Sequence, residues 1–262
     1  NSTGAEPLDA TVAIGTRDPF SLVLFAFEAV LPALAGPSFY ERLFRGEAPA
    51  SSSGGDWTQD VRRALACVKY LSRSFIDGHE GRNWADAAEL VANEDAAFTV
   101  MGDWVNGELS EFLDDGSVRS VPFPGSETVF VFTSDSFPLP VEAPHLPETR
   151  RLLALFATPE AQLAFSAVKG SIPARRDLDV SGLGGRAETT ANDFDASTQL
   201  LATSGSFPYY FPTNELGLAV RDMLAPEAGE EAVEAVVELL RDAYPLLARW
   251  QARLREGAAS EP

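Results

Sequence analysis

The chain has 262 residues, of which 45% are hydrophobic, and it carries 39 acidic against 20 basic side chains for a formal charge of −19. This length and composition predict an ordinary globular protein with a sizeable core, either as one large unit or as two lobes. So negative a chain repels nucleic-acid phosphates and anionic lipid headgroups, which argues against a role on nucleic acid or on a membrane surface.

The small number of cysteine and histidine residues argues against a disulfide-linked protein and against a metal-binding protein. Cys67 is the single cysteine and cannot form an internal disulfide, and the two histidines, His79 and His145, do not stand at metal-ligand spacings. We therefore expect neither a metal nor a cofactor. No apolar run reaches the roughly 18 residues of a membrane span, so we expect no membrane insertion. Residues 1–9 lack the layout of a signal peptide, which leaves a cytosolic chain or one whose export signal has been removed.

The first half of the chain alternates short apolar runs with helical periods. A β-branched run at 11–15 predicts a strand, and Asp18 with Pro19 predicts the cap and first turn of a buried helix over 20–34 that is interrupted near Pro32. Further helices are predicted over 38–44, 56–75 and 84–91. The compact run 96–101 then reads as a buried strand, after which Asp103 can cap another helix.

The second half is mostly helical. Strands are predicted over 118–123 and 128–133, and helices over 148–156, 159–168, 191–201, 215–224 and 230–254, the last with a kink at Pro245. An aromatic loop at 204–214 separates two of these helices. Strands that interleave with helices indicate the α/β class.

The candidate site residues stand just after predicted strands. Asp103 and Trp104 follow the strand at 96–101. A carboxylate there can accept hydrogen bonds from two sugar hydroxyl groups, and an indole can pack on the C–H face of a pyranose. The alternative is that Asp103 only caps a helix and Trp104 belongs to the core. Asp135 follows the strand at 128–133, and its alternative role is a turn that caps its own backbone.

No catalytic constellation accompanies these residues. The sequence has no nucleophile elbow and no phosphate-binding glycine motif, so we do not expect an enzyme. A carbohydrate-active enzyme that uses Asp103 and Asp135 is the weaker alternative.

Five runs resemble, in order and in spacing, those of the extracellular solute-binding proteins of carbohydrate ABC importers, in particular the glucose/mannose-like type. They are Thr11 to Phe20, Ala96 to Trp104, Val121 to Gly125, Thr133 to Pro140, and Lys169 to Arg175. The resemblance implies a periplasmic-binding-protein-like (type II) architecture of two α/β lobes that close on a sugar. It assigns residues 1–122 and 174–262 to the second lobe and residues 123–173 to the first. The rest of the first lobe lies outside this sequence, so a separate chain or segment is expected to supply it.

The resemblance also implies a function. We expect binding of a mono- or oligosaccharide as the solute-binding component of an ABC importer, with the sugar and the ABC permease as partners. The location would be periplasmic or extracellular, and anchoring by a removed N-terminal segment is compatible with it. The ligand-binding positions carried over are Asp103, Trp104, Asp135 and Arg175, and the loop that holds a histidine in the family offers Tyr209, Tyr210 and Asn214 here. The alternative is a non-transport sensor or protein-interaction module that reuses a lobe of this kind.

Overall fold

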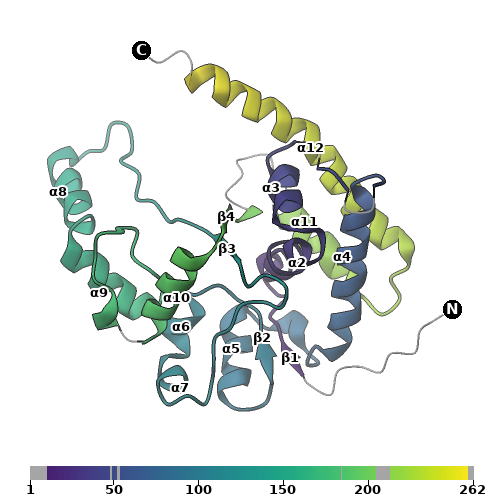
Figure 1. Ribbon diagram of the computed structural model, residues 1–262, viewed down its shortest axis with the longest axis horizontal. Coiled ribbons are helices and arrows are strands. Elements are labelled where there is room, and N and C mark those ends of the chain that lie inside the picture. Colours follow the sequence, from purple (N-terminus) through teal and green to yellow (C-terminus); the bar gives the residue numbers. More distant parts are fainter. Residues whose placement is uncertain (1–10, 48, 52–53, 184, 205–212, 259–262) are drawn as a thin grey trace.

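The computed structural model describes residues 11–258 except 48, 52–53, 184 and 205–212 (Figure 1). The strands are β1 (Val12–Ala13), β2 (Phe98–Thr99), β3 (Val129–Phe132) and β4 (Gln199–Ala202). The α-helices are α1 (Pro19–Val23), α2 (Leu31–Ala35), α3 (Pro37–Phe44), α4 (Thr58–Leu71), α5 (Trp84–Ala92), α6 (Val105–Glu108), α7 (Ser110–Asp114), α8 (Leu146–Phe156), α9 (Pro159–Lys169), α10 (Gly185–Ala196), α11 (Thr213–Leu224) and α12 (Glu230–Ala258). Four short elements complete the set: the π-helix η1 (Leu24–Val30) and the 3-10 turns η2 (Ser72–Ser74), η3 (His79–Gly81) and η4 (Ser181–Leu183).

The described strands form two separate parallel pairs. In the first, Val12 of β1 is in register with Phe98 of β2, and Val12 also forms a bridge to Phe75. In the second, β3 runs beside β4 from the Val129–Gln199 pair to the Phe132–Ala202 pair. The predicted strands at 11–15, 96–101 and 128–133 are thereby confirmed in position, although β1 and β2 have two residues each. The prediction that the run 96–101 is a buried strand is wrong, because Phe98 is 58% exposed. The proportion of strand is nevertheless small, and helices make up most of the described chain.

Two predictions in this part of the chain are wrong. Residues 118–123 form no strand, and Phe123 instead packs edge-on against Phe25 with ring centroids 6.4 Å apart. The predicted helix over 191–201 ends at Ala196, and the residues after it form β4. A short apolar run has no period of its own to separate strand from helix, so the available partner decides, and here β3 lies alongside.

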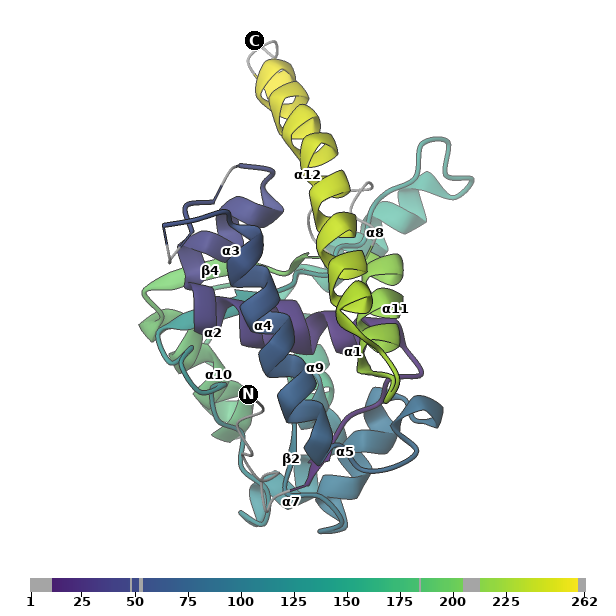
Figure 2. The same cartoon turned by 90° about the vertical axis from the view of Figure 1, so that its right-hand side faces the viewer.

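The core surrounds one long helical stretch. Helices α1, η1 and α2 follow one another without a gap from Pro19 to Ala35, and every residue from 21 to 32 is buried. Helices α3, α4, α11 and α12 pack around it (Figures 1 and 2). Pro32 has no N–H to continue the regular ladder, and just before it the Leu31 N–H bonds to the Ala26 carbonyl five residues back. The predicted interruption thus takes the form of π-helical turns rather than a break.

Two parts of the molecule stand out from this core. Helices α8 and α9 lie on the opposite side of the molecule from α4 (Figure 1), and the C-terminal half of α12 extends beyond the other elements in both views. Helix α12 runs through Pro245 as one helix. Among the described residues, no helix is both long and apolar enough to span a bilayer.

Helices α8 and α9 and the loop before them expose several large apolar side chains. Val168 is 81% exposed and Leu155 is 56% exposed. The other large apolar side chains exposed here are Phe137, Val141, Leu146, Leu152, Phe156 and Phe165. Large apolar side chains gathered in exposed positions on neighbouring helices are typical of a site where another polypeptide packs. We call these eight residues the α8–α9 face.

Candidate functional site

Two loops leave the first strand pair on the same side. The loop 14–18 connects β1 to α1, and the loop 100–104 connects β2 to α6. Because β1 and β2 are parallel neighbours, their carboxyl ends lie at one edge, which is where open α/β proteins bind ligands. The beginning of α5 forms a third wall at this edge.

The loop 14–18 is held firmly against the segment before α5. The Thr16 N–H donates to the His79 carbonyl at 2.9 Å, and the Arg17 N–H donates to the Arg82 carbonyl at 3.0 Å. A Cβ on Gly15 would lie only 2.0 Å from the Asn83 carbonyl oxygen, so the two backbones touch where a side chain would prevent it. The loop is therefore fixed before any ligand arrives.

Helix starts fix the walls of the site. The Phe20 N–H donates to Asp18 Oδ1 at 3.0 Å, which confirms Asp18 and Pro19 as the cap and first turn of α1. At α5, Asn83 and Asp86 form a capping box with two hydrogen bonds of 2.8 Å each. Trp84 is consequently the first residue of a rigidly capped helix.

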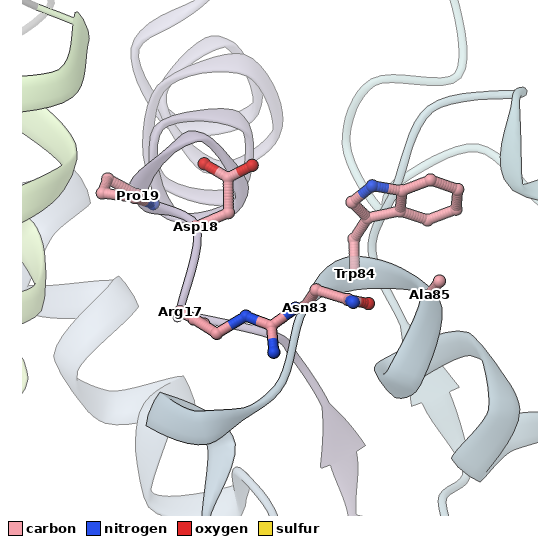
Figure 3. Close-up of a pocket in the computed structure, with 6 residues that line it drawn as sticks. All are labelled: Arg17, Asp18, Pro19, Asn83, Trp84 and Ala85. Carbon is pink, nitrogen blue, oxygen red and sulfur yellow. The ribbon is translucent and has the colours of Figure 1, made fainter.

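A cavity of about 490 Å³ opens between these walls. It is lined by Arg17, Asp18, Pro19, Asn83, Trp84 and Ala85 (Figure 3). The Asp18 carboxylate and the Trp84 indole extend toward the same side, while Arg17 reaches toward Asn83. An aromatic face beside a few fixed polar groups is the arrangement that binds small polyhydroxylated molecules.

Asp103 and Trp104 follow β2 at the same edge as this cavity, but neither residue lines it. The Trp104 ring is 6.2 Å from the Phe20 ring, and it covers Gly102 so closely that a Cβ there would meet ring carbon Cζ3 at 2.2 Å. Burial raises the pKa of Asp103, and the nearby Lys169 charge opposes that shift. Asp103 is not the cap of α6, because that position belongs to Trp104, which makes no side-chain cap bond.

Lys169 links Asp135 to this region. Its Nζ lies 2.6 Å from Asp135 Oδ2 and 5.6 Å from the centroid of the Phe165 ring. The Lys169 charge also acts electrostatically on Asp103, but the ion pair of Lys169 is with Asp135. Asp135 remains largely exposed, with 67% of its side chain accessible.

The remaining predicted residues are placed differently. Arg175 donates to both carboxylate oxygens of Asp177, at 2.9 and 2.5 Å, and to the Ala157 carbonyl at 3.2 Å. Asn214 is exposed in the first turn of α11. Tyr209 and Tyr210 lie outside the described residues.

The cavity residues Arg17, Asn83 and Trp84 were not among the site residues predicted from the sequence. From the sequence, Trp84 was predicted only as the first residue of a helix, and Arg17 only as part of the run from Thr11 to Phe20 that resembles the solute-binding proteins. An aromatic residue directly after an Asn cap is a signal that could have drawn attention to Trp84. Within the described ranges, no group of three or more His, Cys, Asp or Glu side chains is arranged to hold a metal.

No family model matches the chain, but individual relatives do. An uncharacterized ABC transporter extracellular-binding protein of Pyrococcus horikoshii is 33% identical over 168 residues, which are 63% of this chain and 36% of the relative. The xylose/arabinose-binding protein XacG of Haloferax volcanii is 32% identical over 168 residues, with 61% and 34% covered. A probable sugar-binding periplasmic protein of Rhizobium meliloti is 30% identical over 155 residues, with 58% and 36% covered. The matches thus span about a third of each relative's length.

Solved structures resemble the chain over more of its length. The bacterial solute receptor AcbH, which is described as having an exclusive preference for β-D-galactopyranose, matches with a TM-score of 0.65 and 16% identity over 91% of this chain and 61% of that one. A chitin oligosaccharide binding protein matches with a TM-score of 0.66 and 15% identity, with 90% and 60% covered. The likeness confirms the solute-binding-protein fold. The relatives and structures named here are binding proteins and receptors, in agreement with the prediction of a protein that is not an enzyme.

Proposed function

We propose that this chain, which is homologous to part of the solute-binding proteins of carbohydrate ABC transporters, binds a mono- or oligosaccharide at the edge formed by β1, β2 and α5. The observation that carries the proposal is the cavity between Asp18 and Trp84, located beyond the carboxyl ends of two parallel strands. Like its relatives, the chain is a periplasmic or extracellular binding protein. Its membrane partner in this proposal is the permease of an ABC importer.

The chemistry of the cavity suits an uncharged ring with several hydroxyl groups. The Trp84 indole offers a face for the C–H side of a pyranose, and the Asp18 carboxylate keeps acceptor capacity beyond its bond to the Phe20 N–H. Asn83 adds an amide, and the neighbouring Trp104 extends the aromatic surface. Each good hydrogen bond or stacking contact contributes on the order of 1 kcal/mol, so several together give useful affinity.

We further propose a two-lobe, type II arrangement. Residues 1–122 and 174–262 form the second lobe, residues 123–173 pack on the first lobe, and Pro122–Pro124 and Pro173 are the hinge. The α8–α9 face supports this division, because its apolar side chains are exposed here and would be covered by the rest of a first lobe. That cover comes from a further segment of the same protein or from a separate chain.

The test is a thermal-shift and tryptophan-fluorescence screen against xylose, arabinose, galactose, glucose and chitin oligosaccharides. A sugar present at a hundred times its Kd adds about 2.7 kcal/mol to the folded state, which raises the midpoint measurably. Trp84→Ala should then weaken the affinity about tenfold or more, equivalent to about 1.4 kcal/mol.

Trp57→Phe is the matched control for the fluorescence signal. Trp57 is at the start of α4 and packs against the main core, so its replacement should leave the affinity unchanged. If Trp84→Ala binds sugar as tightly as the parent chain, the cavity is not the sugar site.

A sensor or protein-interaction module is the second candidate, favoured by the same exposed α8–α9 face. It predicts a stable complex in pull-downs from the native membrane and no thermal shift with any sugar. A sugar response without such a complex would rule it out.

A further inference from the structure

A histidine side chain links the two walls of the cavity from outside it. His79 is the first residue of the 3-10 turn η3, four residues before Asn83. Its Nδ1 lies 3.0 Å from the hydroxyl oxygen of Thr16, which belongs to the loop 14–18. Neither Thr16 nor His79 lines the cavity. His79 was not among the site residues predicted from the sequence.

The burial of Thr16 makes this bond important. Thr16 is completely buried, so its hydroxyl group has no access to water. Within the part of the chain that the structure describes, the His79 ring is the hydrogen-bond partner of this hydroxyl. The hydroxyl can donate or accept, so it bonds to Nδ1 in either tautomer of the neutral ring. Without the ring it would be a buried polar group that has lost its bonds to water, which is unfavourable.

The His79 ring is itself held in place. The Phe75 ring packs edge-on against it, with centroids 5.6 Å apart and the planes at 78°. Phe75 is buried and belongs to the main core. On the other side, His79 Nε2 lies 3.5 Å from Glu80 Oε1, and only 19% of the His79 side chain is exposed. The core therefore fixes the position of Nδ1, and Nδ1 in turn fixes the Thr16 hydroxyl.

The segments joined by this bond carry the cavity residues (Figure 3). Thr16 directly precedes Asp18 and its neighbour Arg17 in one wall. On the other side, the turn η3 leads within a few residues to the start of α5, where Trp84 lines the cavity. The backbone bonds from residues 16 and 17 hold the two segments together along their main chains, and the His79 ring adds a side-chain link. A shift of Thr16 relative to η3 would therefore change the separation of the walls.

We propose that His79 is a positioning residue for the sugar site, in which it fixes Thr16 and thereby the separation between the wall that carries Asp18 and the wall that carries Trp84. This inference rests on the proposed function. Ordering a site during binding costs affinity, so walls that are fixed in advance bind a sugar more tightly than walls that the sugar must bring together.

The first experiment needs no sugar. Hydrogen exchange is measured at the N–H groups of Thr16 and Arg17, which donate across the two segments. Thr16→Val removes the hydroxyl and keeps the shape of the side chain, and His79→Leu removes the ring nitrogens. Each should raise exchange at these two N–H groups about tenfold relative to exchange in α4. His79→Asn should restore most of the protection, because its amide has a polar atom as far along the side chain as Nδ1.

His145→Leu is the matched control, since His145 is the other histidine and is exposed just before α8. It should leave exchange at Thr16 and Arg17 unchanged. Where His79→Leu does not fold, Thr16→Val is compared with Thr16→Ser, which keeps the hydroxyl and should retain the protection. Unaltered exchange in Thr16→Val would overturn the proposal, as would a rise in His79→Leu that His79→Asn does not reverse.

The second experiment measures sugar affinity at a temperature where all variants are folded. Thr16→Val and His79→Leu should each weaken the affinity about tenfold, and the double variant should bind about as well as either, because both changes remove the same bond. His79→Asn should stay within about threefold of the parent chain. A loss of stability alone would move the unfolding midpoint without producing this pattern in the affinity.

The outcomes separate this proposal from the proposed function. If the parent chain binds sugar and both single variants bind it equally well, His79 is not a positioning residue and the proposed function stands. The same conclusion follows if the two losses multiply in the double variant. If the parent chain binds no sugar, the proposed function fails, and the exchange data alone decide whether His79 fixes the loop 14–18.

Discussion

Replacing Gly15 by alanine tests whether the wall of the site is as tightly packed as the structure shows. The added Cβ would stand 2.0 Å from the Asn83 carbonyl oxygen, 2.2 Å from its carbon and 2.8 Å from the Trp84 nitrogen. All three atoms belong to the backbone at the capped start of α5, so no side chain can rotate away. The loop and α5 must separate by more than 1 Å to restore an ordinary contact distance of about 3.4 Å. Overpacking of this kind costs about 1–3 kcal/mol.

Urea denaturation of Gly15→Ala should therefore give a free energy of unfolding lower by about 1–3 kcal/mol. The sugar affinity should fall as well, because Asn83 and Trp84 move with α5. Gly81→Ala is the matched control: it lies in the neighbouring turn, and a Cβ there meets nothing within 4 Å. A Gly15→Ala variant as stable as the parent chain would show that these backbones are not in contact and that the cavity is not pre-formed.

Three further predictions concern the rest of the molecule. Burial raises the pKa of Asp103 above the ordinary 3.8, so the folded state holds this proton more tightly than the unfolded chain, and the resulting stability is lost as the pH rises through the raised pKa. In urea titrations at several pH values, Asp103→Asn should therefore gain stability relative to the parent chain over that pH range. A stability difference that does not change with pH would contradict the raised pKa. Leu155→Ser on the exposed α8–α9 face should change the unfolding free energy by no more than about 0.5 kcal/mol, yet weaken co-purification with a polypeptide that supplies the rest of the first lobe. Thr158→Ala removes the cap bond to the Ala161 N–H and should cost about 1 kcal/mol in chemical denaturation, whereas Thr158→Ser should restore most of it.

The elements that could be predicted are those with local signals. Asp18 and Pro19 mark the start of α1 because a cap and a first-turn proline act within one turn of helix. The same holds for Gly170, which ends α9 in the left-handed conformation with φ of 80°. Ordered motifs also pointed to Asp103 and Trp104, but neither residue lines the cavity, and their role in binding stays a prediction.

The sequence by itself determined the likeness to the solute-binding-protein fold, the capped starts of helices and the position of Asp103 and Trp104 after a strand. Each of these features is encoded by neighbouring residues or by an ordered series of short runs. Only the tertiary structure decided that residues 199–202 form a strand beside β3, that Trp84 and Asp18 line one cavity, and that the Glu28 carboxylate accepts a hydrogen bond from the Ser204 N–H. These pairs are separated by tens to more than a hundred residues along the chain. Their contacts depend on how helices pack around α1, η1 and α2, and no local pattern of residues specifies that packing.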